Sequence, residues 1–280
     1  MWCPPPLLDR LARRGSALGF AGLLLWAVTG LMACATAQPV VIESARLAPP
    51  GIIGNDDREI LDASEWPWTA IGRVNRLPGA GFCTGTLIGR TTVLTAAHCL
   101  YDEDVRRFAS PGDIHFLAGY RRGQFLAHST ARAFTIPDGF QAPQGRQGNT
   151  PAADWALIHL STPIDMPTVG WISLTGTELL GRLRQGRLVQ AGYSQDRAHI
   201  LSVHNGCGAD GIALQGRVIL HNCDATRGDS GSPLLLFEGA GVSIVGVHIG
   251  YSDRSGRRRG AAVSAATFGA AALRAFLAAN

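Results

Sequence analysis

From Ile60 onward the chain consists of short apolar runs separated by turn residues, and this pattern restricts the fold more than any other feature. The runs are Trp68–Val74, Gly85–Ile88, Thr92–Ala97, Ile114–Ala118, Trp155–Leu160, Arg187–Ala191, Arg217–Leu220, Pro233–Phe237 and Ser243–Ile249. Short runs rich in Val, Ile, Leu and Thr and bounded by Gly or Pro are typical of strands. With 35 Gly and 15 Pro in 280 residues, the pattern predicts an all-β barrel or sandwich. One helix is predicted near the C-terminus, over Thr267–Ala278.

The first 37 residues have the layout of a secretory signal. Three arginines (Arg10, Arg13 and Arg14) precede an apolar stretch, and the small residues Ala35–Ala37 form a cleavage site before Gln38. A transmembrane anchor is the alternative, since an apolar stretch of about 17 residues approaches the length needed to span a bilayer. We predict that the signal is removed and the protein exported.

Export divides the chain into three parts: a signal peptide over 1–37, a propeptide or linker over 38–51, and one domain over 52–280. The segment Leu31–Cys34 resembles an imperfect bacterial lipoprotein signal, so cleavage before Cys34 would instead leave a lipid-anchored protein. Without lipidation at Cys34, we expect no membrane association after cleavage.

The charge of the chain argues against nucleic acid as a partner. The formal net charge is +4, and residues 1–37 carry three Arg and one Asp, a net +2, which leaves about +2 on the rest. The run Arg257–Arg259 lies among glycines and serines, which predicts a solvated loop.

Three short segments carry residues that together suit nucleophilic catalysis. Gly228–Pro233 places Ser230 among glycines, Thr95–Cys99 places His98 after small residues, and Ala153–Ile158 opens an apolar run with Asp154. A serine hydroxyl is a poor nucleophile until a neighbouring base removes its proton. A histidine supplies that base, and an aspartate holds the imidazole in the correct tautomer.

These segments resemble the signature blocks of the chymotrypsin-like (trypsin-fold) serine peptidases, in the chain order His, Asp, Ser. The resemblance implies an all-β fold of two six-stranded antiparallel barrels with a C-terminal helix. It also implies a serine endopeptidase that hydrolyses polypeptide substrates through His98, Asp154 and Ser230 and an acyl-enzyme. No cofactor or metal is expected, and a single copy of the chain suffices.

The glycines beside Ser230 fit the same chemistry. Gly228 can adopt backbone angles that other residues resist, so its N–H and that of Ser230 can point at the developing oxyanion. We therefore predict an oxyanion hole formed by the Gly228 and Ser230 amides. The alternative from another class is a protease-fold binding protein without activity, but such a protein usually lacks some of these positions.

Four cysteines remain after the signal is removed: Cys83, Cys99, Cys207 and Cys223. An even number in an exported protein suggests two disulfides, with three connectivities open. We favour Cys83–Cys99, because both would lie on adjacent strands that support His98, and Cys207–Cys223 ahead of the serine. The first would close a loop of about 15 residues, worth ~3 kcal/mol in the chain-entropy model. A metal site is the rival interpretation, but the sequence has no CxxC pair.

The resemblance also gives Asp229 a role in activation. In the family, an acid just before the serine pairs with the α-amino group released by propeptide cleavage. The segment Gly51–Asn55 resembles the mature start, so Ile52 is the candidate N-terminus and Asp229 its partner. Gly51 rather than Arg precedes this cut, which departs from activation by a trypsin-like enzyme.

Three further segments resemble the bacterial glutamyl-endopeptidase-like branch of the family. They are Ile53–Arg58 followed by Trp66–Gly72, and Gly246–Gly250 near the C-terminus. In that branch the histidine that matches His248 helps to bind a substrate glutamate, and Gly250 would line the same pocket. This resemblance implies a bacterial enzyme that is secreted or periplasmic.

The residues ahead of Ser230 give conflicting indications of substrate. Asp224 lies six residues before Ser230, where trypsin-like members carry the pocket acid that selects Arg or Lys. Arg227 and His248 favour glutamate instead. Thr226 also stands where trypsin-like members have a cysteine, so Asp224 would alternatively face Arg227 or solvent. We expect an Arg/Lys-directed enzyme, with a glutamate-specific enzyme as the alternative.

Overall fold

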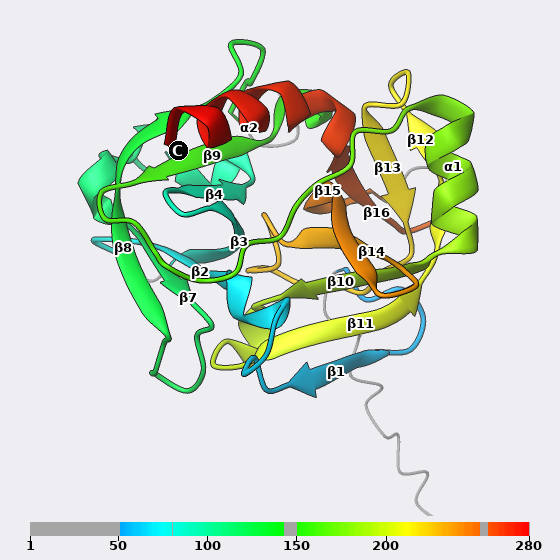
Figure 1. The fold of residues 1–280 in the computed structure, drawn as a ribbon, viewed down its shortest axis with the longest axis horizontal. Helices are drawn as coiled ribbons and strands as arrows, with labels where there is room; N and C mark the ends of the chain where they lie inside the picture. The colour runs from blue at the N-terminus through cyan, green and yellow to red at the C-terminus, as the bar shows by residue number, and fades with distance from the viewer. Residues whose placement is uncertain (1–50, 80, 143–149, 253–256, 280) are drawn as a thin grey trace, which may run out of the picture. The chain divides into compact units, whose positions relative to one another are not determined.

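The computed structural model describes residues 51–79, 81–142, 150–252 and 257–279 (Figure 1). The predicted signal peptide, Cys34 and residues 38–50 lie outside these residues. Among the helices that are described, none has the length and apolar character needed to cross a membrane.

Six strands form a closed antiparallel barrel in the order β2-β3-β4-β9-β8-β7. The strands are β2 (Ile71–Arg76), β3 (Phe82–Gly89), β4 (Thr92–Thr95), β7 (Ile114–Ala118), β8 (Ala127–Thr135) and β9 (Ala156–Leu160). The barrel closes because β2 pairs with β3 on one side and with β7 on the other. Five of these strands fall on predicted apolar runs. The exception is β8, whose alternating polar residues hide it in the sequence.

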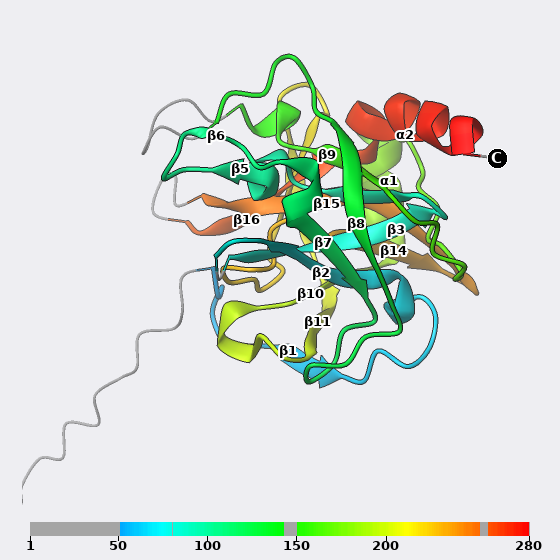
Figure 2. The same cartoon turned by 90° about the vertical axis from the view of Figure 1, so that its left-hand side faces the viewer.

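Eight further strands form a second sheet in the order β1-β11-β10-β14-β15-β16-β13-β12. They are β1 (Arg58–Leu61), β10 (Arg187–Gly192), β11 (Leu201–Cys207), β12 (Ala209–Ala213), β13 (Val218–His221), β14 (Pro233–Glu238), β15 (Gly241–Ser252) and β16 (Arg259–Ser264). Both views place β1 at one edge, beside β11 (Figures 1 and 2).

The trypsin-like all-β fold is confirmed, but its second half differs from the six-stranded barrel predicted above. The added strand β1 pairs with β11, and the hairpin β12-β13 extends the opposite end. In the described residues this sheet therefore curls with two edges and does not form a second closed ring.

Two α-helices accompany the sheets in the part of the chain that the structure describes. The helix predicted at the C-terminus is present as α2 (Ala265–Ala279), which contacts β3, β15 and β16. The helix α1 (Gly176–Gln185) is not apparent in the sequence because glycines interrupt it. It forms because Leu179 and Leu183, one turn apart, are buried in a small apolar cluster with strands of the eight-stranded sheet.

Short elements complete the chain. A two-stranded hairpin joins β5 (Tyr101–Asp102) to β6 (Arg107–Phe108). The described residues include five single-turn 3-10 helices: η1 (Trp68–Ala70), η2 (Ala97–Leu100), η3 (Pro111–Asp113), η4 (Pro151–Ala153) and η5 (Gln195–Arg197). The main apolar core includes residues of both sheets. The segments that hold the candidate site emerge from the strands around this core.

Candidate active site

His98 and Asp154 are brought together by one pair of strands. His98 lies in η2, three residues beyond the end of β4, and Asp154 lies two residues before the start of β9. Because β4 and β9 pair with Thr95 opposite Ala156, the two side chains emerge side by side. Asp154 Oδ1 accepts the backbone N–H of His98 at 2.9 Å, and Oδ2 lies 2.8 Å from Nδ1.

This geometry fixes the tautomer of His98. An ionised carboxylate only accepts hydrogen bonds, so Nδ1 carries the proton and Nε2 is left as a base. Burial opposes protonation of His98, but the charge and hydrogen bond of Asp154, together with the charge of Glu103, hold its pKa above the usual value. Asp154 is buried at 1 % exposure, while the His98 side chain is 24 % exposed and can reach a substrate.

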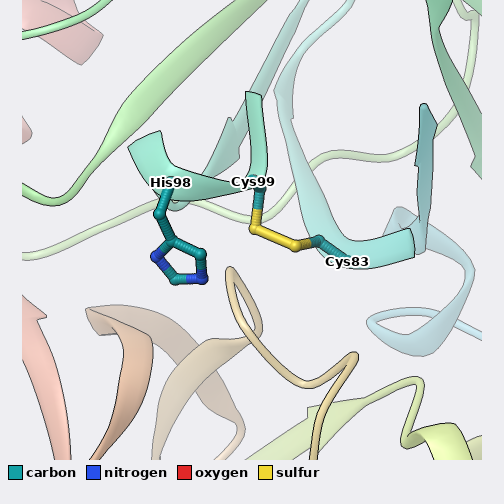
Figure 3. A group of neighbouring side chains, drawn as sticks. All are labelled: Cys83, His98 and Cys99. Carbon is teal, nitrogen blue, oxygen red and sulfur yellow. A yellow bond between two sulfur atoms is a disulfide. The ribbon is translucent and has the colours of Figure 1, made fainter. Parts of the chain in front are cut away.

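The predicted disulfide pairings are present in the structure. Cys83–Cys99 lies beside His98 (Figure 3). It links β3 to η2, and Cys207–Cys223 links the end of β11 to the segment after β13. Cys99 Sγ lies 3.7 Å from the carbonyl oxygen of Ser230, which places the serine segment against the disulfide.

The Ser230 loop belongs to the eight-stranded sheet but is held by the closed barrel. Thr84, on β3, donates its N–H to the Ser230 carbonyl at 2.8 Å and its hydroxyl to the Gly228 carbonyl at 2.9 Å. The same hydroxyl accepts the N–H of Tyr193 at 2.9 Å. Thr84 therefore fixes the loop on both sides of Asp229, a role that nothing in the sequence indicates.

Gly228 and Gly231 must be glycines in this loop. Both have positive φ angles, 93° and 82°. A Cβ at Gly231 would collide with Thr84 on β3 and with Thr95 at the end of β4. The absence of a side chain thus lets the serine loop approach β3 and β4, the strand that precedes His98.

Asp229 contacts neighbours other than the one predicted. Its Oδ2 accepts the Ser194 hydroxyl and the Thr226 N–H, each at 2.7 Å. Burial raises the pKa of Asp229 to about 6, although these two hydrogen bonds oppose the rise. In the structure Ile52 is peptide-linked to Gly51, so its nitrogen bears no charge to offer a carboxylate. The Ile52–Asp229 pair therefore remains a prediction for a cleaved chain.

Asp224 does not have the position expected of a pocket acid. Its carboxylate accepts the N–H of Ile53 at 2.7 Å and of Asp57 at 2.9 Å, and lies 3.3 Å from His204. Burial would raise the pKa of Asp224, but His204 and the two N–H groups hold it below its usual value. Both oxygens accept hydrogen bonds from residues 51–57, the N-terminal segment of the described domain. The expectation that Asp224 offers its charge to a substrate cation or to Arg227 is therefore wrong. Arg227 itself is exposed.

His248 lies on β15 and contacts a second buried histidine, His221, for which the sequence indicates no role. His221 Nδ1 accepts the Cys223 N–H at 3.2 Å, so its proton is on Nε2. That nitrogen lies 3.2 Å from His248 Nδ1 and donates to it. We infer that His248 carries its own proton on Nε2, as a hydrogen-bond donor.

Both histidines of this pair are neutral. Burial and the nearby His98 lower the pKa of His248 to about 3. Burial and the neighbouring histidines hold the pKa of His221 well below its usual value. Gly260 packs on the ring of His221, where a Cβ would collide with it, whereas Gly250 has a positive φ of 144° and open space beside it.

One group of residues has a composition that suits a metal ion. Asp57, His204 and Asp224 offer ligand atoms within 4.8 Å of one another. The Asp224 oxygens already accept two backbone N–H groups, and His204 Nδ1 accepts the N–H of Asp224 at 2.9 Å. These hydrogen bonds occupy the ligand atoms of Asp224 and His204, and we assign no ion to the group.

The fold, with His98 and Asp154 paired beside a serine loop, defines a trypsin-like serine peptidase. The Trypsin family model matches residues 57–270, and the chain belongs to that family. Glutamyl endopeptidase of Bacillus licheniformis is 32% identical over 190 residues, covering 65% of this chain and 54% of the relative. Mouse tryptase is 31% identical over 121 residues, covering 41% and 38%. The alignments thus span about half or less of these relatives.

Solved structures show the same fold. A Glu endopeptidase in complex with MPD has a TM-score of 0.66 at 22% identity, covering 81% of this chain and 99% of that one. The Vibrio cholerae VesB protease has a TM-score of 0.57 at 18% identity, covering 77% and 65%.

Proposed function

We propose that the protein is a serine endopeptidase in which His98, Asp154 and Ser230 form the catalytic triad. The observation that carries this proposal is the pair of hydrogen bonds from His98 to Asp154, one through the backbone N–H and one through Nδ1. A serine flanked by glycines of positive φ lies in the adjacent loop. Family membership supports the same reaction class.

The residues divide the reaction as follows. His98 Nε2 takes the proton of the Ser230 hydroxyl as Oγ attacks the substrate carbonyl, and a tetrahedral oxyanion forms. The amides of Gly228 and Ser230 stabilise that oxyanion. His98 then gives the proton to the leaving amine, which leaves an acyl-enzyme on Ser230. Water, activated by His98 in the same way, hydrolyses the ester and restores the serine.

 

A recess beside His98 suits the leaving peptide. The recess beside His98 measures about 290 Å³ and is lined by His98, Phe82, the Cys83–Cys99 disulfide and Glu103, among others. Because His98 must protonate the leaving amine, the peptide that follows the scissile bond would lie against these residues.

For specificity, the arrangement favours glutamate over Arg or Lys before the scissile bond. Asp224 is engaged by Ile53 and Asp57, so it offers no free carboxylate to a substrate cation. His248 instead presents an N–H donor, set by its hydrogen bond with His221. A neutral donor suits a carboxylate side chain, and the name of the Bacillus licheniformis relative, glutamyl endopeptidase, agrees with this choice.

We also place the protein outside the cytosol. The structure has two disulfides, and disulfides form and persist in oxidising compartments but are rare in the cytosol. Polypeptides of that compartment would be its substrates.

Cleavage of a mixed peptide library by the exported chain tests the function and the specificity together. We expect cleavage after glutamate, abolished by Ser230→Ala. Asp224→Asn should leave the preference unchanged, whereas His248→Gln should weaken it. Cleavage that survives Ser230→Ala would refute the triad, and cleavage after Arg or Lys that requires Asp224 would refute the glutamate assignment.

A further inference from the structure

Arg58 is a buried cation beside the candidate site, and the proposed reaction gives it no role. Its side chain is 1 % exposed. Nε and one terminal nitrogen donate to Asp56 at 2.8 Å each, and the two terminal nitrogens donate to Asp196 at 3.0 and 2.7 Å. The guanidinium thus makes two forked carboxylate contacts, a geometry that a lysine cannot reproduce.

Asp196 connects Arg58 to the serine loop. Its Oδ1 accepts the Thr226 hydroxyl at 3.1 Å. The two residues before it act on the same loop: the Gln195 N–H donates to the Arg227 carbonyl at 2.6 Å, and the Ser194 hydroxyl donates to Asp229 at 2.7 Å. Three consecutive residues, 194–196, therefore hold three of the four residues that lead to Ser230.

The N-terminal segment is fastened to the other side of the same loop. Asp224 accepts two of its backbone N–H groups, from Ile53 and Asp57. The Ala225 N–H also donates to the Gly51 carbonyl at 3.2 Å. Arg197 adds contacts to the Arg58 carbonyl and to Asp56, each at 2.8 Å.

We propose that Arg58 is a positioning residue for the oxyanion hole. Through Asp196 and Thr226 it fixes the segment ahead of Gly228, so that the Gly228 amide is held in place while Ile52 remains peptide-linked. This inference rests on the proposed function, because it assigns Arg58 to the oxyanion step of that reaction. A donor that is already oriented stabilises the transition state without reorganisation.

Two mild variants test the role. Thr226→Val removes the hydroxyl that Asp196 holds, and Arg58→Lys keeps the charge but loses the fork. We expect each to lower kcat on the order of tenfold with little change in KM, less than the hundredfold or more that follows loss of an oxyanion donor. Arg182→Lys is the matched control, since Arg182 also makes a forked pair, with Glu238 at the surface.

Inhibitor binding separates positioning from a merely structural role. A peptide aldehyde adds to Ser230 Oγ, and the oxygen of the resulting hemiacetal occupies the oxyanion hole, whereas a cleaved product peptide does not form that adduct. The aldehyde inhibition constant should rise in parallel with the fall in kcat/KM, while that of the product stays constant. Unchanged kcat and aldehyde binding in both variants, with only a lower thermal midpoint, would overturn the proposal. An inactive parent enzyme would instead contradict the proposed function.

Discussion

The closed barrel and the eight-stranded sheet contribute to the site in different ways. The barrel places His98 and Asp154 at the ends of paired strands, so main-chain pairing sets their geometry. The sheet contributes Ser230 from a loop between β13 and β14, which depends on side-chain contacts from Thr84 and Ser194. Strand pairing fixes His98 and Asp154, so the residues around them should tolerate substitution. A few polar contacts fix the Ser230 loop, so activity should be sensitive to the loss of each contact.

The largest effect should come from the barrel half. Asp154→Asn keeps the shape but presents an amide to His98 Nδ1 and so favours the wrong tautomer. We expect kcat to fall about 10⁴-fold, the size of effect known for this substitution in a serine-protease triad. Steady-state kinetics measures it, with thermal unfolding as the control for folding. A fall of tenfold or less would contradict the assigned role.

Asp229 should make the sheet half sensitive to pH. A carboxyl whose folded pKa is raised stabilises the fold below its unfolded pKa and loses that contribution as pH rises through the folded value, here about 6. Asp229→Asn removes the titration, so the parent should lose about 2 kcal/mol of unfolding free energy relative to this variant between pH 4 and 7. Urea unfolding at several pH values measures the difference. A constant difference, or one of opposite sign, would refute the assignment.

Thr84 offers a test of the contact between the two halves. Thr84→Val removes the hydrogen bonds to Gly228 and Tyr193 and should cost about 1–3 kcal/mol of stability, together with a lower kcat. Thr86→Val is the matched control on the same strand, because the buried Thr86 hydroxyl has no partner in the described structure. Equal effects of the two substitutions would contradict the role of Thr84.

The smallest effect concerns the surface next to His98. Glu103 raises the pKa of His98, so Glu103→Gln should move the acid limb of the kcat/KM profile to lower pH. Glu65→Gln, which removes the same charge from an exposed side chain before η1, serves as the control. A profile that stays in place, or that moves to higher pH, would be evidence against this influence.

The sequence predicted those parts of the molecule that local patterns encode. Apolar runs marked most strands, and three short blocks marked His98, Asp154 and Ser230. The strand β8 was missed because its polar residues become a strand only through pairing with β7 and β9. Thr84 and His221 were missed because their roles arise from contacts with residues distant in the chain.

The expectation for Asp224 failed for a related reason. Its spacing from Ser230 gives its place along the chain but not the direction of its side chain. The carboxylate turns to the N–H groups of Ile53 and Asp57, and no local pattern shows that this segment docks there.

The most direct test of the central claim is the rate at which a fluorophosphonate labels the exported chain, with the modified residue located by mass spectrometry. We predict one adduct, on Ser230, that forms rapidly in the parent, far more slowly in Asp154→Asn, and not at all in Ser230→Ala. A parent that stays unlabelled, or one labelled equally fast without Asp154, would contradict a triad assembled from the two halves.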